Sequence, residues 1–214
     1  MGSKVDIVNR ALTKLNAKRL TSINDGTKNS ADANAVYDGI LDEVLASFPW
    51  NFATRRISLA RLVAAPAYKY DFQFRLPSQP KVMHVWEAVS DNQTPTKLYV
   101  IEGDDEGGLL LTNFTAIDIK YTARIIDTER FSPWFVESFA TRLAAELAYP
   151  VTGKRAIAED QMKQYYFKIQ IAGMKEGQQG EDYVADDSKH PLEDDWVGIR
   201  HGGTSRIIGD TSGT

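Results

Sequence analysis

The stretch SADANAVYDGILDEVLASFPWNFATRR, residues 30–56, decides the fold of this chain. Its apolar residues recur at three- and four-residue intervals, which predicts an amphipathic helix with one broad apolar face. We expect Asn29 or Ser30 to cap this helix and Asp32 to add a negative charge near its start. Pro49 ends it, because proline has no N–H to donate and disfavours helical geometry in the preceding residue.

Three large rings surround this proline and dominate the helix exit. Phe48, Trp50 and Phe52 are bulky and apolar, and none of them carries a reactive group. Large aromatic side chains bury the most surface of any residue type. They therefore predict a hydrophobic hinge that closes the core.

A second helix is expected before this stretch, over residues 3–15, where apolar residues again recur at helical spacing. Ser3 followed by Asp6 forms an approximate capping box. The Asn-Asp-Gly sequence at residues 24–26 predicts a turn, since these residues tolerate left-handed geometry. The two helices should form an antiparallel hairpin.

The hydrophobic period changes to two from residue 68, where apolar and polar residues alternate as far as residue 76. Further strands are predicted at residues 82–89, 98–102, 109–112 and 117–125, with an acidic, glycine-containing turn at residues 103–108. Turns at intervals of about a dozen residues favour a mainly antiparallel sheet or a small barrel.

Helical spacing returns at Ser132-Pro133, a cap followed by a proline in the first turn. We expect Pro150 to end this helix and a fourth helix to open at Thr152 or Gly153. Gly173 and Gly177 then provide its stop signals.

The predicted fold class is therefore α+β. N- and C-terminal helix pairs at residues 1–60 and 127–176 form a four-helix body, the inserted β region covers residues 61–126, and an extended acidic C-terminal arm covers residues 177–214.

The arm differs from the rest of the chain in composition. Residues 176–214 hold nine acidic residues against three basic ones, a net of -6, which leaves residues 1–175 at +2. Two interpretations stay open: a disordered tail, or an arm that becomes ordered on a partner. In the second case its isolated apolar residues would be the anchors, namely Tyr183, Trp196, Ile199, Ile207 and Ile208.

Composition excludes several classes of function. The chain has no cysteine, so disulfides and thiolate metal sites are excluded. No apolar run approaches the length of a membrane span, and the N-terminus lacks the apolar core of a signal peptide. Arg55, Arg56 and Arg61 are the nearest thing to a basic cluster, and we interpret them as a solvated or subunit-facing surface.

No catalytic, cofactor-binding or metal-binding residues are predicted. His84, His190 and His201 are scattered without a partner at metal-ligand spacing, and no phosphate loop or nucleophile elbow is present.

Six segments in order resemble a known family. They are IVNRALTKL (7–15), LTSINDG (20–26), DEVLASFPWNFA (42–53), FRLP (74–77), YTARIID (121–127) and FSPWFVESFATRLAAELA (131–148). Together they are similar to the tail tubular protein A family, the head-to-tail adaptors of short-tailed bacteriophages. The resemblance spans roughly residues 4–175 and gives no dependable correspondence in the arm.

The resemblance implies a virion structural protein that is not an enzyme, located in the tail or neck of the phage and assembled in the host cytoplasm. Its partners would be further copies of itself in a ring, with twelve copies to match the portal, together with the portal protein and the tail nozzle protein. Double-stranded DNA would pass through the lumen without specific binding. No cofactor and no membrane are implied.

One alternative from a different class stays open, a carboxylate-dependent glycan (cell-wall) hydrolase associated with a phage tail. Such enzymes use a pair of carboxyl groups. Glu102, Asp104, Asp127 and Glu129 lie near predicted strand ends, where such a pair can form.

Overall fold

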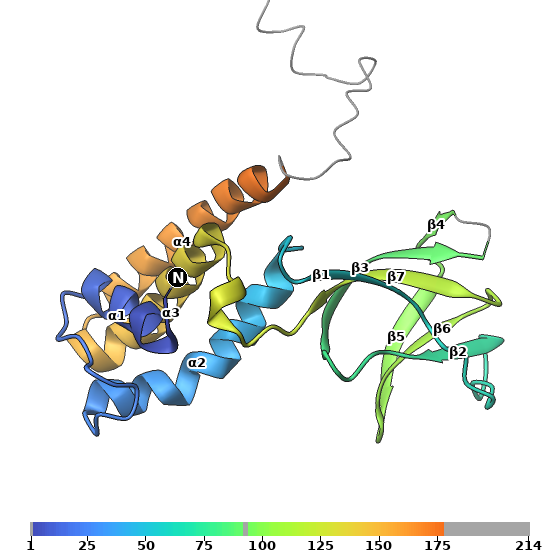
Figure 1. Cartoon of the computed structure of the whole chain (residues 1–214), viewed down its shortest axis with the longest axis horizontal. Helices are drawn as coiled ribbons and strands as arrows, with labels where there is room; N and C mark the ends of the chain where they lie inside the picture. The colour runs from blue at the N-terminus through green and yellow to red at the C-terminus, as the bar shows by residue number, and fades with distance from the viewer. Residues whose placement is uncertain (1, 92–93, 178–214) are drawn as a thin grey trace, which may run out of the picture. The chain divides into compact units, whose positions relative to one another are not determined.

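The computed structural model describes residues 2–91 and 94–177, and this part of the chain has a mixed α+β architecture (Figure 1). The helices are α1 (Lys4–Lys14), α2 (Lys28–Ser47), α3 (Pro133–Thr152) and α4 (Arg155–Gly177), with a short 3₁₀ helix, η1 (Thr128–Arg130). The strands are β1 (Thr54–Ser58), β2 (Phe72–Arg75), β3 (Val82–Ser90), β4 (Pro95–Thr96), β5 (Tyr99–Asp104), β6 (Gly107–Thr112) and β7 (Ile117–Ala123).

The strands form two sheets. One has the order β1-β7-β3-β4 and the other the order β2-β6-β5, and every strand pair is antiparallel. The prediction of an α+β fold with mainly antiparallel strands is confirmed. The strands form two sheets, whereas a single sheet or a small barrel was expected.

The start of α1 is the predicted capping box. The Asp6 amide donates to Ser3 Oγ at 3.3 Å, and the Ser3 amide donates to Asp6 Oδ2 at 2.8 Å. The start of α2 was predicted wrongly: Thr27 is the N-cap, and its hydroxyl accepts from the Ser30 amide. Asp32 consequently lies beyond the first turn, where the helix dipole favours it little.

The predicted hydrophobic hinge is confirmed. Phe48 is extended directly after α2, and Trp50 is fully buried. The Trp50 Nε1 donates to the Val44 carbonyl at 2.8 Å, so burial leaves no polar atom of the indole unpaired. The Trp50 ring meets the ring of Phe48 at 5.3 Å and that of Phe135, from α3, at 5.0 Å, both edge-on.

Strand β1 was not predicted, and it begins directly after this hinge. It pairs with β7, Arg55 lying opposite Tyr121, and so places the end of residues 1–60 in a sheet. None of the residues of β1 is fully buried, and its sequence shows no alternation of apolar and polar residues. Its position comes from pairing with a distant strand, which local periodicity does not record.

Strand β2 is shorter than predicted. Residues 68–71 do not pair, Lys69 has a left-handed backbone with φ of 72°, and Tyr68 is 81% exposed. A left-handed residue interrupts the alternation of faces that a strand needs. The alternating pattern therefore predicted a strand over residues 68–71 that the structure does not have.

The predicted ends of the C-terminal helices also need correction. α3 continues through Pro150 and ends at Thr152, followed by the cap residue Gly153, which has a φ of 70°. Because Pro150 lies in the last turn, its missing N–H removes a single hydrogen bond near a terminus. α4 continues through Gly173, where an added Cβ would lie 3.1 Å from the Phe48 ring. The glycine at position 173 therefore lets the backbone of α4 lie close to the Phe48 ring.

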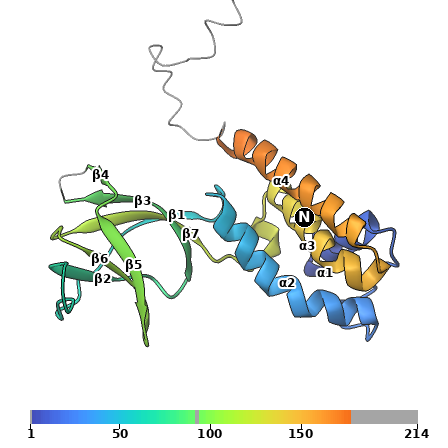
Figure 2. The same cartoon turned by 180° about the vertical axis from the view of Figure 1, so that it is seen from behind.

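α3 is the most buried helix, and it packs against α1, α2 and α4 (Figure 2). At its exposed edge, Glu137 accepts from the ammonium groups of Lys14, on α1, and Lys168, on α4. Burial alone would raise the pKa of Glu137, but the hydrogen bonds from the two lysines outweigh it and lower that pKa. Burial lowers the pKa of Lys14, which also faces Lys168.

We expect Trp50→Ala to reduce the free energy of unfolding by about 3–5 kcal/mol, since it leaves a cavity among packed rings and removes the donor to Val44. Urea titration followed by circular dichroism measures the loss. Trp134→Ala is the matched control: Trp134 is 40% exposed, so its loss should be less than half as large. Equal losses would contradict the role assigned to Trp50.

We expect Glu137→Gln to cost on the order of 1 kcal/mol near neutral pH, a figure discounted for the 37% exposure of the Glu137 side chain. The folded-state pKa of Glu137 is lowered from 4.5, so its stabilisation is present above that value and lost as pH falls through the folded value. Urea titrations should therefore show a lower stability of the variant at neutral pH and equal stabilities of wild type and variant at acid pH. Glu146→Gln, which removes an exposed i,i+4 partner of Arg142, should cost less. A difference that persists at acid pH would be inconsistent with this account.

Candidate functional site

The three-stranded sheet has one face in the core and one directed outward. Phe74 and Leu110 lie opposite each other and are buried. Because successive residues of a strand point to opposite faces, Gln73, Arg75 and Asp104 belong to the other face, which we call the outer face. The ion pairs of Arg75 considered below lie on this face, whereas Ile101, which lines one of the pockets, lies opposite Leu110 on the other face.

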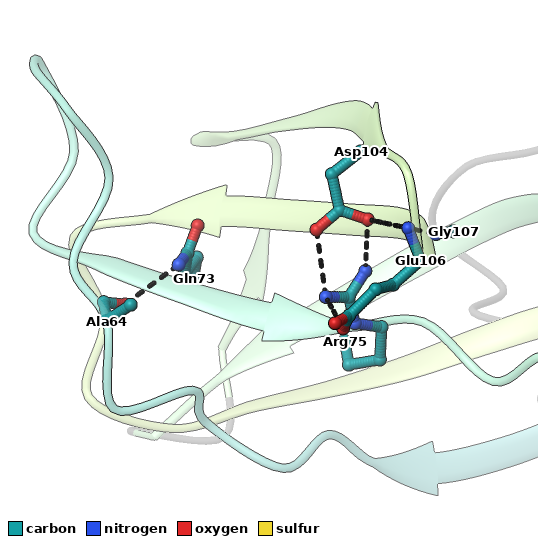
Figure 3. Close-up of polar contacts among 6 residues, drawn as sticks. All are labelled: Ala64, Gln73, Arg75, Asp104, Glu106 and Gly107. Atoms are coloured by element: carbon teal, nitrogen blue, oxygen red, sulfur yellow. Dashed lines mark hydrogen bonds and ion pairs between the residues drawn. The ribbon is translucent and has the colours of Figure 1, made fainter.

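An uncharged loop leads into this sheet. Residues 62–68, LVAAPAY, carry no charge, and we call them the apolar loop. The Leu62 amide donates to the Gln73 carbonyl at 2.9 Å. Gln73 Nε2 donates to the Ala64 carbonyl, also at 2.9 Å (Figure 3). The base of the loop is thus fastened to the first residues of β2.

The tip of the apolar loop is exposed to solvent. Val63 is fully exposed at 104%, and Tyr68 is 81% exposed. Beside them, the Arg61 guanidinium lies 4.6 Å from the centre of the Phe72 ring, a cation–π contact that further fixes the base. Exposed apolar groups on a held loop mark a candidate interaction site.

The turn between β5 and β6 is a charged tip, as predicted. Arg75 binds Asp104 through two parallel hydrogen bonds of 2.5 and 2.8 Å, and its Nη2 also reaches Glu106 Oε2 at 2.9 Å (Figure 3). Asp104 Oδ1 accepts from the amides of Glu106 and Gly107. The hydrogen bond from Arg75 lowers the pKa of Asp104, and the same bond raises the pKa of Arg75. The turn is therefore cross-linked to β2.

A pocket of about 570 Å³ opens where β2 ends and the two sheets diverge. Six apolar residues line it, and we call it the inter-sheet pocket: Leu76, Pro77, Val82, Met83, Val85 and Ile101. Gly108 forms part of its wall, and an added Cβ there would lie 2.9 Å from Leu76. Ile101 is 46% exposed, so apolar surface remains open to solvent at the pocket.

A second groove, of about 640 Å³, runs along α1 and has polar walls. Its polar groups fasten the connection after α1 to that helix: Asn9 exchanges hydrogen bonds with the backbone of Leu20, and Arg19 donates to Thr13. This groove is explained by the packing of α1.

The three arginines singled out in the sequence do not act as one patch. Arg55 donates to the carbonyls of Phe52 and Thr54, and Arg61 stacks on Phe72. Arg56 is exposed on β1 at the edge of its sheet.

The carboxylates of the alternative hypothesis lie in two separate segments. Glu102 and Asp104 are on β5, whereas Asp127 caps η1 by accepting from the Glu129 amide at 3.0 Å. Asp104 is held ionised by Arg75, which does not suit the protonated acid that glycoside hydrolysis requires.

His84 stacks on Trp86, with ring centroids 4.1 Å apart, while His190 and His201 lie outside the described residues. Within residues 2–91 and 94–177, no three His, Asp or Glu side chains come together as a metal site would require. Over the same ranges, none of the helices combines the length and apolarity needed to cross a bilayer.

The predicted anchors of the arm, Tyr183, Trp196, Ile199, Ile207 and Ile208, also lie outside the described residues. Sequence reasoning missed the apolar loop and the role of Arg75. The uncharged run with a central proline was a signal for the loop, whereas the partners of Arg75 are 29 and 31 residues away and left no local signal.

No family model fits this sequence, and no curated protein sequence matches it at a significant level.

We expect Arg75→Met to loosen the β5–β6 turn, because Asp104 then loses the group that positions it beneath the turn amides. Amide hydrogen exchange at Glu106 and Gly107 should become faster, with little change in the urea midpoint. Arg56→Met removes an exposed arginine of the other sheet and should leave that exchange unchanged. Unaltered exchange in Arg75→Met would show that the ion pairs do not order the turn.

Proposed function

We propose that this protein is a virion structural protein, the head-to-tail adaptor of a short-tailed bacteriophage. Copies assemble into a ring, with twelve as the expected number, between the portal and the tail nozzle, and genomic DNA passes through it. In this proposal the four helices form one body, the two sheets form the β region, and residues 177–214 are an arm.

The observation that carries the proposal is that the resembling segments meet in space. Trp50, from the segment 42–53, packs against Phe135, from the segment 131–148, at 5.0 Å. Arg124, from the segment 121–127, binds Asp42 at 2.5 Å. Residues that carry the resemblance therefore contact one another across the fold, which is what a shared fold requires of them.

Several surfaces suit assembly. A ring needs two different patches on each copy, one for each neighbour. The apolar loop and the inter-sheet pocket supply such patches in the β region. The arm adds a third, with Trp196 and Ile207-Ile208 as apolar anchors for the portal and ordering only on binding. Delayed ordering would limit assembly before the partner is present.

The charge of the chain fits a passage for DNA. Its net charge is -4, made up of -6 in residues 176–214 and +2 in residues 1–175, and Arg55 and Arg61 are engaged within the β region and its junction with α2. A neutral or acidic lumen repels phosphate and keeps a duplex mobile, whereas a basic one would bind it. The lumen-lining residues are not assigned.

Electron microscopy of the purified chain, alone and mixed with its portal protein, tests the proposal. Closed rings that sit on the tail-facing side of the portal are expected, and portal alone is the control. A chain that forms no ring and does not bind portal would contradict it. So would turnover of a cell-wall glycan that Glu102→Gln or Asp127→Asn abolishes while leaving the fold intact.

A further inference from the structure

We infer that the apolar loop of one copy docks into the inter-sheet pocket of the next copy, and that this contact links neighbours in the ring. The inference rests on the proposed function and specifies its contact. The occupant of the pocket is thus residues 62–68 of a second copy of this chain.

The two features lie at opposite ends of one strand. The apolar loop precedes Phe72, the first residue of β2, whereas Leu76, which follows its last residue, lines the inter-sheet pocket. The same order holds along the hairpin, where Tyr99 pairs at the loop end and Gly107 and Gly108 border the pocket. With the apolar loop at one end and the inter-sheet pocket at the other, docking of one into the other produces head-to-tail contacts, and such contacts repeat around a ring.

The chemistry of the two features is complementary. The loop is uncharged and its tip is exposed, with Val63 at 104% and Tyr68 at 81%. The pocket is lined mainly by apolar residues, and its volume of about 570 Å³ accommodates several small side chains. Burial of Val63 in it would remove from water apolar surface on both partners.

The charges around the two features also match. Arg61 and Lys69 flank the apolar loop, while Asp105 and Glu106 form the turn beside the glycines of the pocket. Glu106 is 82% exposed despite its bond to Arg75. Lys81 lies on the other side of the pocket, so favourable pairing requires the basic flanks to meet the hairpin side.

Both partners are ordered before they meet. The base of the loop is fixed by the hydrogen bonds between Leu62, Ala64 and Gln73, and the hairpin is fixed by Arg75. Preorganised partners lose less conformational entropy on binding. One such contact buries little surface. Each copy would make it twice, once through its loop and once through its pocket, and closure of the ring would add the contacts of all copies together.

Disulfide trapping tests the contact, and the full chain suits it because it contains no cysteine. The double variant Val63→Cys with Met83→Cys should form a ladder of covalent oligomers under mild oxidation. A mixture of the two single variants should stop at dimers, because each chain then carries one thiol. Ile126→Cys with Met83→Cys is the matched control, since Ile126 is 67% exposed on the connection after β7, and it should give no ladder.

The outcomes separate this inference from the proposed function. Rings and portal binding without a ladder in the double variant would overturn the contact and leave the adaptor role standing. Dimers of Val63→Cys alone, at the level of the mixture, would show a symmetric contact and also overturn it. A ladder in a chain that does not bind portal would support the contact and count against the adaptor role.

A charge substitution gives an independent readout. Val63→Asp should abolish rings, or at least raise the concentration at which they form tenfold, while the thermal unfolding midpoint stays unchanged because Val63 contributes nothing to the core. Ile126→Asp should leave ring formation as in the wild type. Rings of Val63→Asp that form at the wild-type concentration would refute the docking of the loop.

Discussion

The packing of Trp50 among aromatic rings is the contact on which the rest of this structure depends. The chain crosses from helix to sheet at Trp50 and returns through Phe131 to α3. Both crossings meet in one cluster, where Phe52 contacts Phe131 at 5.5 Å and Trp50 contacts Phe135 at 5.0 Å. Fixing these rings therefore fixes how α2, β1 and α3 leave the junction, and with them the start of the four-stranded sheet.

Ion pairs reinforce this junction without replacing it. Arg124 binds Asp42 at 2.5 Å, and their side chains are 28% and 30% exposed. Pairs of that exposure contribute about 0–1 kcal/mol, whereas removal of a buried tryptophan costs about 3–5 kcal/mol. At this junction the aromatic cluster therefore contributes more to stability than the ion pair does, and the ion pair links α2 to the segment after β7.

Local signals in the sequence predicted the parts that local chemistry determines. The caps at Ser3 and Ser132, the stop at Pro49 and the buried hinge are all set within a few residues. Strand β1 was missed because its place comes from pairing with β7, whose paired residues are 60 to 68 positions away in the sequence. Of the candidate site, an acidic turn was predicted from composition at residues 103–108, and the structure has a turn at residues 105–106. Neither the hydrogen bond between Gln73 and Ala64 nor the inter-sheet pocket has a local signature.

The position of these surfaces on a sheet has a physical consequence for assembly. A strand pair holds its two ends at a fixed separation, so in the proposed ring the apolar loop before β2 and the inter-sheet pocket after it would keep the same spacing in every copy. The edge of β5 is the competing surface, since an edge strand can pair with any exposed strand. The charged turn that ends β5, cross-linked to Arg75, limits such pairing at that end. In the proposed ring, contacts between other parts of neighbouring copies would then have to set the angle between them, and closure of a ring depends on that angle.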